Sequence, residues 1–260
     1  MTLILTPLPG IPLVRQGDNL AQLILLALDR AGLALQDGDI LVLAQKVVSK
    51  AEGRLVNLEQ VTASPAAIGL AERAQKDPRL VELILQESQQ VLRVRPGTII
   101  VEHRLGFICA SAGIDHSNVE PASDSREDSH PEAWVLLLPE DPDASAQAIR
   151  QQLEEASGAR LGVLIIDSHG RAWRLGTVGV AIGIAGLPAL VDLRGAPDLF
   201  DFRLQITQVG AADELAAAAS LVMGQAAEGT PIIHVRGFPY PLREAALVEL
   251  IRPKEQDLFR

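Results

Sequence analysis

The sequence predicts a mixed α/β (α+β) protein, because short apolar runs rich in β-branched residues alternate with segments of helical periodicity. Three runs, at 40–44, 163–166 and 232–235, are typical of buried strands, and polar residues follow each of them closely. The segment 19–31 repeats its apolar residues at intervals of three and four, as an amphipathic helix does. With 260 residues, the chain fits one large domain or two small ones.

Cap and turn residues delimit the elements of the first half. Asp18 can cap the first helix and Gly32 can end it, while Ser64-Pro65 has the form of a helix start. Glu87 is interpreted as the polar end of the helix that begins at Pro78. The predicted elements are a strand at 2–6, a helix at 19–31, a strand at 40–44, helices at 66–75 and 78–88, and a hairpin formed by 91–101 and 107–110.

The second half opens with an acidic stretch, 120–133, that is rich in Ser and Pro and has no periodicity, so we predict a mobile loop there. The elements predicted after it are a strand at 135–138, a helix at 143–156, a strand at 163–166, a strand at 203–210, a helix at 213–223, a strand at 232–235 and a helix at 241–251.

Composition excludes several classes of protein. A net charge of −10 argues against a nucleic-acid-binding surface, although it allows a local basic pocket. The single cysteine, Cys109, rules out an internal disulfide and a cysteine-based zinc site, and it fits a reduced cytoplasm. The N-terminus lacks the basic region of a signal peptide, and no apolar run reaches the length of a membrane span. We therefore expect a soluble cytoplasmic protein with no nucleic-acid or membrane partner.

The segment 161–187 carries the most chemistry. A buried strand at 163–166 is expected to end in Asp167 and Ser168, and Arg171 and Arg174 follow in a glycine-rich stretch. A carboxylate, a hydroxyl and two guanidiniums suit a metal-bound phosphate, because the metal takes hard oxygen ligands and arginine binds phosphate oxygens in pairs. The alternative is a plain Asp-Ser turn with arginines on the surface.

Two further polar clusters follow apolar runs in the same way. Gln45 to Lys50 brings two lysines and a serine directly after the strand at 40–44, and Asp115 to Asn118 follows the strand of the hairpin. The sequence has no P-loop, no G-x-G-x-x-G after a strand and no G-x-S-x-G. Either these clusters are solvated turns, or all three share one cleft that binds metal and phosphate.

At these clusters the sequence resembles the coenzyme F420-0:L-glutamate ligases, the γ-glutamyl ligases of deazaflavin coenzyme biosynthesis. The resemblance covers about residues 8–237 and rests on the segments GIPLVRQGDNL, DGDILVLAQKVVSKAEGR, KDPRLVELILQES, GFICASAGIDHSNV, LLPEDPDASAQAIR, IIDSHGRAWRLGTVGVAIGIAG, DLRGAPDLFDFRLQIT, ADELAAAASLVMG and PIIHVRG. It implies a single domain over 1–260, divisible into two subdomains, with a mixed α/β fold unlike the P-loop and Rossmann folds. It also implies an intertwined homodimer.

The activity implied by the resemblance is a GTP-dependent amide ligation. The γ-phosphate of GTP would pass to the terminal carboxylate of coenzyme F420-0, a phospholactyl deazaflavin, and the amine of L-glutamate would then attack the acyl phosphate. Further glutamates would be added through γ-linkages. The family needs two divalent ions, Mg²⁺ or Mn²⁺, and K⁺ assists.

Residue by residue, the resemblance makes Asp115 and Asp167 the catalytic carboxylates that hold the metals, with Ser168 as a further metal ligand in place of the more usual threonine. Gln225 stands where relatives often have a glutamate metal ligand, and either its uncharged amide oxygen coordinates the second metal or Glu228 substitutes for it. The implied nucleotide contacts are Pro9, Gly10, Ile11 and Pro12, then Gln45, Lys46 and Lys50, then Asn118, and finally Met223, Gly224, Gln225, Ala226, Ala227, Glu228, Gly229 and Thr230.

One role comes from the residues and not from the resemblance: Arg171 and Arg174 could bind the phosphodiester or the carboxylate of the deazaflavin. Two other functions remain open on the same sequence. One is a non-catalytic protein that binds a nucleotide or a deazaflavin. The other is a related ligase with a different acid acceptor or amino-acid donor.

Overall fold

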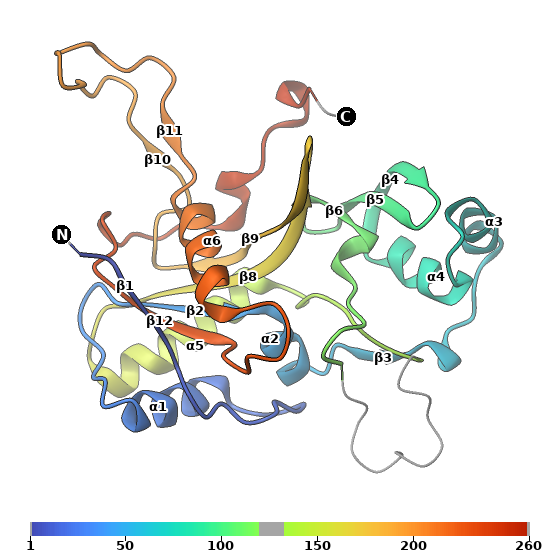
Figure 1. Cartoon of the computed structure of the whole chain (residues 1–260), viewed down its shortest axis with the longest axis horizontal. Helices are drawn as coiled ribbons and strands as arrows, with labels where there is room; N and C mark the ends of the chain where they lie inside the picture. The colour runs from blue at the N-terminus through green and yellow to red at the C-terminus, as the bar shows by residue number, and fades with distance from the viewer. Residues whose placement is uncertain (1, 120–132, 259–260) are drawn as a thin grey trace.

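A five-stranded sheet forms the centre of the computed structural model, which describes residues 2–119 and 133–258 (Figure 1). Only one pair of neighbours, β2 and β8, runs parallel, and the other pairs are antiparallel. The mixed α/β class predicted above is therefore confirmed. In spatial order, the strands are β1 (Ile4–Pro7), β12 (Ile232–Arg236), β2 (Ile40–Ala44), β8 (Gly162–Arg171) and β9 (Arg174–Ala185).

Strand β8 continues past the end of β2. The last residue of β2, Ala44, pairs with Ile166, whereas β8 runs on to Arg171 along β9. The predicted end of this strand at residue 166 is therefore wrong, because Asp167 and the residues after it remain hydrogen-bonded in register with β9. Beyond Ile166, the edge of β8 that paired with β2 has no partner strand among the described residues, and the polar side chains stand on this part of the strand.

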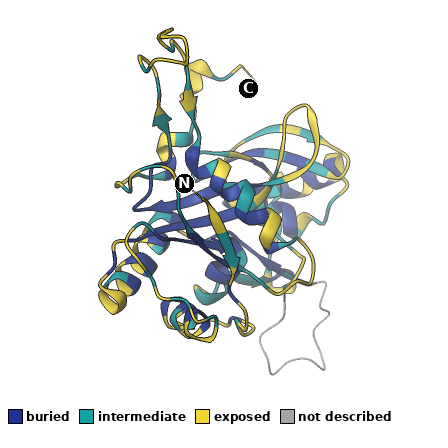
Figure 2. Cartoon of the chain, turned by 60° about the vertical axis from the view of Figure 1, so that its left-hand side comes forward, coloured by how far each residue is buried: buried dark blue, intermediate teal, exposed yellow. Residues whose placement is uncertain are grey.

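Helices cover both faces of the sheet, and Figure 2 shows the buried strands between them. Helices α1 (Leu20–Arg30) and α5 (Pro142–Ser157) contribute to the apolar core on one face, and α6 (Ala211–Met223) packs on the other. Two glycines of β9 permit these contacts. A Cβ atom on Gly183 would lie 2.5 Å from the carbonyl oxygen of Pro142, and one on Gly179 would lie 2.5 Å from that of Ala216.

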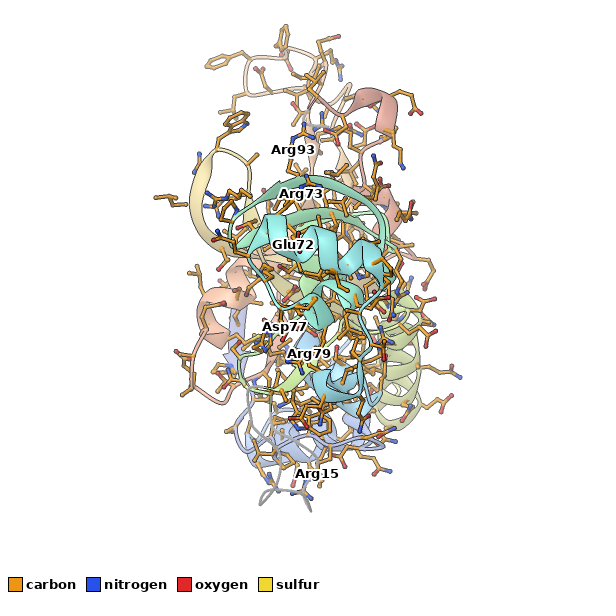
Figure 3. The ribbon with its side chains drawn as sticks, turned by 90° about the vertical axis from the view of Figure 1, so that its right-hand side faces the viewer. Arg15, Glu72, Arg73, Asp77, Arg79 and Arg93 are labelled. Carbon is orange, nitrogen blue, oxygen red and sulfur yellow. The ribbon has the colours of Figure 1, made fainter. Side chains whose placement is uncertain are left out.

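A smaller lobe, residues 55–113 and 133–137, has its own apolar core. Ser64 and Asp77 cap its two α-helices through side-chain oxygens, as the S-P and D-P pairs predict, and Asp77 also pairs with Arg79 on the face seen in Figure 3. The elements of the lobe are β3 (Leu55–Asn57), α3 (Pro65–Ala74), α4 (Pro78–Gln86), β4 (Ser88–Arg95), β5 (Thr98–His103), β6 (Ile108–Ala110) and β7 (Trp134–Leu136).

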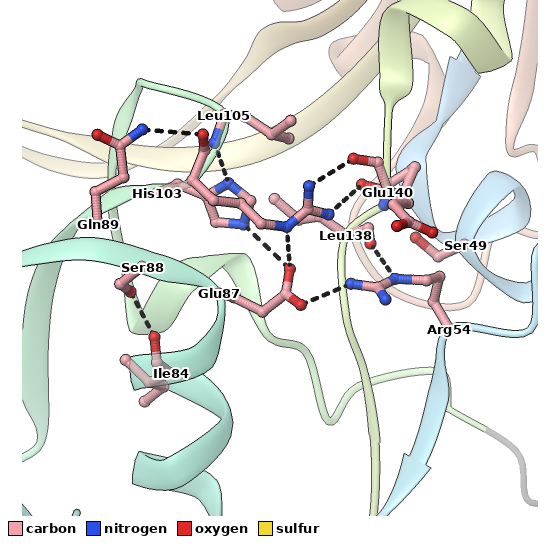
Figure 4. A network of polar contacts seen from close by, with 12 residues as sticks. Ser49, Arg54, Ile84, Glu87, Ser88, Gln89, His103, Leu105, Leu138 and Glu140 are labelled. Atoms are coloured by element: carbon pink, nitrogen blue, oxygen red, sulfur yellow. Dashed lines mark hydrogen bonds and ion pairs between the residues drawn. The ribbon is translucent and has the colours of Figure 1, made fainter. Parts of the chain in front are cut away.

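Glu87 joins the smaller lobe to the chain segments beside it (Figure 4). Its carboxylate accepts hydrogen bonds from Arg54 Nη2 at 2.8 Å and from Arg104 Nε at 2.9 Å. The two guanidiniums in turn donate to the carbonyl oxygens of Leu138 and Glu140. The interpretation of Glu87 as only the polar end of a helix is therefore wrong, because its side chain is nearly buried among cations.

The segment 190–210 projects from the body as a long arm (Figure 1). Within it, β10 (Val191–Asp192) pairs with β11 (Gln208–Val209), and Pro197 forms an isolated antiparallel bridge with Arg203, so the strand predicted at 203–210 is mostly wrong. Hydrogen bonds between turn residues replace the ladder, for example from the amide of Leu204 to the carbonyl of Ala196.

The structure differs from the sequence predictions at the start of α1 and near the C-terminus. Asn19, not Asp18, caps α1, because its side chain accepts from the amide of Gln22 whereas Asp18 accepts from Arg15. The helix predicted at 241–251 is wrong, since only a 3₁₀ turn, η4 (Leu247–Leu250), forms there. The mobile loop predicted at 120–133 lies, except for its last residue, outside the described residues. In the part of the chain that is described, no helix combines the length and apolarity of a membrane span.

Tertiary contacts explain the missing C-terminal helix. The amide of Leu247 donates to the carboxylate of Asp143, and Arg243 pairs with Glu249 while also donating to the carbonyl of Leu190. The bond to Asp143 takes the amide of Leu247 out of any helical ladder, and the Arg243 side chain anchors the segment to the loop at Leu190. Other short turns in the described part of the chain are η1 (Leu58–Gln60), η2 (Ser111–Gly113) and η5 (Lys254–Gln256).

Candidate functional site

A cavity of about 830 Å³ lies where β2 ends and β8 continues. Because β2 stops at Ala44, the chain turns at once into α2 (Gln45–Ala51), and the free side of β8 faces the space beyond. The sequence analysis did not predict α2. The walls of the cavity come from residues within 11–14, 44–50, 110–119, 166–170 and 223–231, together with Thr177 and Ser220.

Helix α2 presents two rows of polar side chains to the site. Gln45 and Ser49, one turn apart, are buried, and the Ser49 hydroxyl donates to Gln45 Oε1 at 2.8 Å. That bond orients the Gln45 amide so that Nε2 donates to Asp115 Oδ2 at 3.1 Å. Lys46 and Lys50 form the second row, so the helical spacing places both ammonium groups on one wall.

The two lysines fix the loop that follows Asp115. Lys46 Nζ lies 3.2 Å from Asp115 Oδ2 and donates to the Ser117 hydroxyl at 2.7 Å. Lys50 Nζ donates to the carbonyl of Asn118 at 2.7 Å. The first and second polar clusters of the sequence are therefore in direct contact.

Asp115 and Asp167 face the same interior. Burial raises the pKa of Asp115; the Lys46 ammonium opposes this, and the negative charge of Asp167 adds to it. The site thus holds two carboxylates that repel one another through a poorly solvated space. His169 lies on the other side of Asp167, with Nε2 3.0 Å from Asp167 Oδ2.

The loop after α6 closes the site. Ser168 Oγ donates to Gln225 Oε1 at 2.7 Å, and Gln225 Nε2 donates to Ser220 Oγ at 2.9 Å, so the amide oxygen of Gln225 points toward β8. Asn118 Nδ2 donates to the carbonyl of Ala226 at 3.0 Å. Glu228 instead turns back on its own loop and accepts from the amide of Ala226, and the backbone N–H groups of the loop lower its pKa.

These donors fit a hard divalent cation. Carboxylate, hydroxyl and amide oxygens are the ligands that Mg²⁺ and Mn²⁺ prefer, and a cation between Asp115 and Asp167 would relieve their repulsion. No group of three or more His, Cys, Asp or Glu side chains suited to a metal occurs within 2–119 and 133–258. A complete ligand set would therefore draw on Ser168, on Gln225 and on the substrate.

The structure brings most of the sequence-predicted site residues together. Ile11 and Pro12 line the cavity with the residues of the three polar clusters and the loop 223–230. Pro9 and Gly10 do not line it; the carbonyl of Gly10 accepts a bond from Arg30 instead. Their roles, like those of the other site residues, stay predictions.

Arg171 and Arg174 are also outside the cavity lining. They flank the turn that joins β8 to β9, both exposed, and Arg171 Nη1 donates to the carbonyl of Gly176 at 3.2 Å. Sequence reasoning missed His169 and Ser220. For His169 a signal was present, since alternation along a strand that continues past residue 166 places it on the face of Asp167.

Comparison with known proteins identifies the family of the chain. The family model "F420-0:Gamma-glutamyl ligase" matches residues 10–237. A protein of Methanothermobacter thermautotrophicus named coenzyme F420:L-glutamate ligase is 49% identical over 253 residues, which cover 96% of each chain. Proteins of the same name from Methanopyrus kandleri and Methanocaldococcus jannaschii are 46% and 40% identical, over 100% and 96% of this chain and 98% and 94% of their own. The chain therefore belongs to the F420-0:gamma-glutamyl ligase family.

Proposed function

We propose that this protein is a ligase of coenzyme F420 biosynthesis that joins L-glutamate to the carboxylate of coenzyme F420-0, consumes GTP, and then adds further γ-linked glutamates. The membership of the family and the names of the relatives support the acceptor and the amino acid. The observation that carries the nucleotide part is the cavity at the end of β2, where Lys46, Lys50 and two carboxylates face each other.

The chemistry requires the acceptor carboxylate to be activated before an amine can displace oxygen from it. In the proposed reaction, the carboxylate attacks the γ-phosphate of GTP, GDP leaves, and an acyl phosphate forms. The amine of glutamate then attacks the acyl carbon, loses a proton and expels inorganic phosphate. No side chain acts as a nucleophile, since the substrates supply both.

The residues of the chain bind and orient these groups. Lys46 and Lys50 supply compact positive charge to the phosphates, and their bonds to the loop at Ser117 and Asn118 hold that wall in place. Asp115, Asp167, Ser168 and Gln225 would hold two Mg²⁺ or Mn²⁺ ions. When bound, such ions neutralise the charge that develops on the transferred phosphoryl group. K⁺ is proposed as an assisting ion without assigned ligands.

The test is an incubation of the purified protein with GTP, Mn²⁺, L-glutamate and coenzyme F420-0, followed by mass spectrometry. GTP-dependent mass gains in glutamyl steps support the ligase and give the tail length. Nucleotide binding without GDP release would mean a non-catalytic binding protein. GDP release only with another acid or another amino acid would mean a related ligase.

We also propose that the chain works as a homodimer. The arm at 190–210 carries large apolar side chains that are almost fully exposed at its end, and such patches mark interaction surfaces. Leu199 is 96% exposed and Phe200 89% exposed. Light scattering is expected to give twice the chain mass of 27.8 kDa, and Phe200→Glu is expected to shift the protein toward the monomer. A monomeric wild-type protein would contradict the dimer.

A further inference from the structure

A second hollow, of about 290 Å³, lies against the main cavity. His169 and Gly170 line both spaces, so the end of β8 forms the ridge between them. The other walls are Phe107 and Ile108 at the start of β6, Val180 on β9, and the C-terminal segment around η4. In Figure 1 the C-terminal segment, β9 and β6 lie close to one another around this place.

The walls of this hollow are mostly apolar, and one of them is a fixed ring. Phe107 stacks on His103 with ring centroids 5.0 Å apart and planes 2° apart, and it meets His169 at 5.4 Å with a tilt of 47°. Contacts with these two rings hold Phe107 in place as an apolar wall of the hollow, and aromatic rings favour edge contacts as well as stacked contacts with other flat rings. Leu250 and Ile251 add apolar surface to the hollow.

Charge and size restrict the occupant. Among the described residues, Arg252 is the only basic side chain besides His169 that lines the hollow, and Asp213 and Asp257 line it as well. With two acidic side chains and few basic ones, the hollow disfavours binding of glutamate, which carries two carboxylates. The volume is at the lower end for ligand pockets, which suits a fused-ring system and not a whole coenzyme.

The contents of the main cavity also indicate that the ring system of the acceptor binds elsewhere. In the proposed reaction it must hold GTP and also receive the acceptor carboxylate, while the ring system of the acceptor needs a separate apolar place. Gly170 leaves a way across the ridge, because a Cβ atom built on it would meet nothing within 4 Å.

We propose that the fused-ring head of the deazaflavin acceptor binds in this second hollow against Phe107, and that its tail crosses the ridge at Gly170 into the main cavity. This assignment rests on the proposed function. It gives the acceptor a site distinct from the exposed hairpin turn that carries Arg171 and Arg174.

The variant Gly170→Leu tests the passage, and Gly69→Leu on α3 is its matched control. Both glycines have open space at Cβ and neither has a positive φ, so both variants are expected to fold. Leucine at position 170 is expected to raise the KM for coenzyme F420-0 by at least about tenfold and to weaken its direct binding, measured through the fluorescence of the deazaflavin, by a similar factor. The KM for GTP is expected to stay within about twofold of the wild type.

A second pair of variants tests the wall. Ile108 is 36% exposed at the hollow and Ile68 is 46% exposed on α3, so Ile108→Gln and Ile68→Gln make similar changes at different places. Only Ile108→Gln is expected to weaken binding of the acceptor, by about threefold to tenfold, as the loss of apolar contact predicts.

The outcomes separate the inference from the function on which it rests. If the wild type forms glutamylated product while Gly170→Leu and Ile108→Gln bind the acceptor as tightly as it does, the hollow is not the acceptor site. If Gly170→Leu loses GTP and acceptor binding together, the ridge belongs to the nucleotide site and the assignment is overturned. If the wild type binds the deazaflavin and gives no product with it, the proposed function fails, and the binding data on the variants still decide the place of the ring.

Discussion

Removal of the Glu87 carboxylate by Glu87→Ala is expected to destabilise the protein by about 2–3 kcal/mol. The side chain is 11% exposed and accepts from two guanidiniums, whose side chains are 20% exposed in Arg54 and 29% exposed in Arg104. Breaking a buried ion pair costs about 3–5 kcal/mol because a charge is left without a partner. Here the cost is smaller, since both guanidiniums keep their carbonyl acceptors and some contact with water.

Urea unfolding at pH 7 measures this change, with Glu72→Ala as the control. Glu72 is an exposed residue of α3 in the same lobe, and its replacement is expected to change the free energy of unfolding by less than about 0.5 kcal/mol. In a thermal scan, 2–3 kcal/mol corresponds to a fall in Tm of about 4–12 °C for a domain of this size. A Glu87→Ala protein as stable as Glu72→Ala would refute the view that the Glu87 ion pairs hold the smaller lobe against the chain segments beside it.

The pH dependence of this network gives a second readout. Burial would raise the pKa of Glu87, but the hydrogen bonds from Arg104 and Arg54 outweigh it and hold the pKa below its usual value. Burial lowers the pKa of the neighbouring His103 to about 4. Both pKa values are depressed by folding, so this stabilisation is present at pH 7 and is lost as the pH falls from about 6.5 toward 4 and below. Glu87→Ala is expected to lose less stability than the wild type below about pH 4.5, where Glu87 itself titrates. Between about pH 6.5 and 4.5 it is expected to lose at least as much, because the Glu87 charge raises the pKa of His103 and the variant lacks that charge.

Three other changes have definite expected outcomes. Burial would raise the pKa of Asp39, yet hydrogen bonds from Arg236 and His234 hold it at about 2. The wild type should therefore lose up to about 2 kcal/mol of stability as the pH falls from about 4 to 2, and Asp39→Asn should not show this loss. Urea unfolding across that pH range measures the difference. Asp167→Asn should abolish turnover while the circular dichroism and Tm stay close to wild type; a folded variant with normal turnover would remove the metal assignment. Gly183→Ala should cost about 1–3 kcal/mol, because the new Cβ would lie 2.5 Å from the carbonyl of Pro142, and an unchanged urea midpoint would contradict that packing.

The sequence predicted the central strands and most of the helices because their signals are local. The strand at 40–44 and the caps of α3 and α4 depend on apolar runs and on Ser64-Pro65 and Asp77-Pro78, which act within a few residues. The gathering of the polar clusters at one cavity was predicted as one of two possibilities. It depends on β2 and β8 being parallel neighbours, which the chain order alone does not determine.

Several of the failures share one cause, which is that distant contacts overrode local patterns. Asp167 and Ser168 have the polar character of a strand end, but pairing with β9 keeps them in the strand. The segment 241–251 has helical periodicity, but Asp143 takes the amide of Leu247 from across the molecule. Glu87 is separated by 33 residues from Arg54, and no local pattern links the two.

The order of strands in the sheet constrains how the chain is assembled during synthesis. β12 lies between β1 and β2 and pairs with both, so the first strand of the chain has no partner in the sheet until residues 232–236 have been made. Such long-range pairing slows folding and leaves sheet edges open in a growing chain. A ribosome-bound chain that stops before residue 232 would expose β1 and one side of β2. Stalled chains of this protein should therefore depend on chaperones until the last strand emerges.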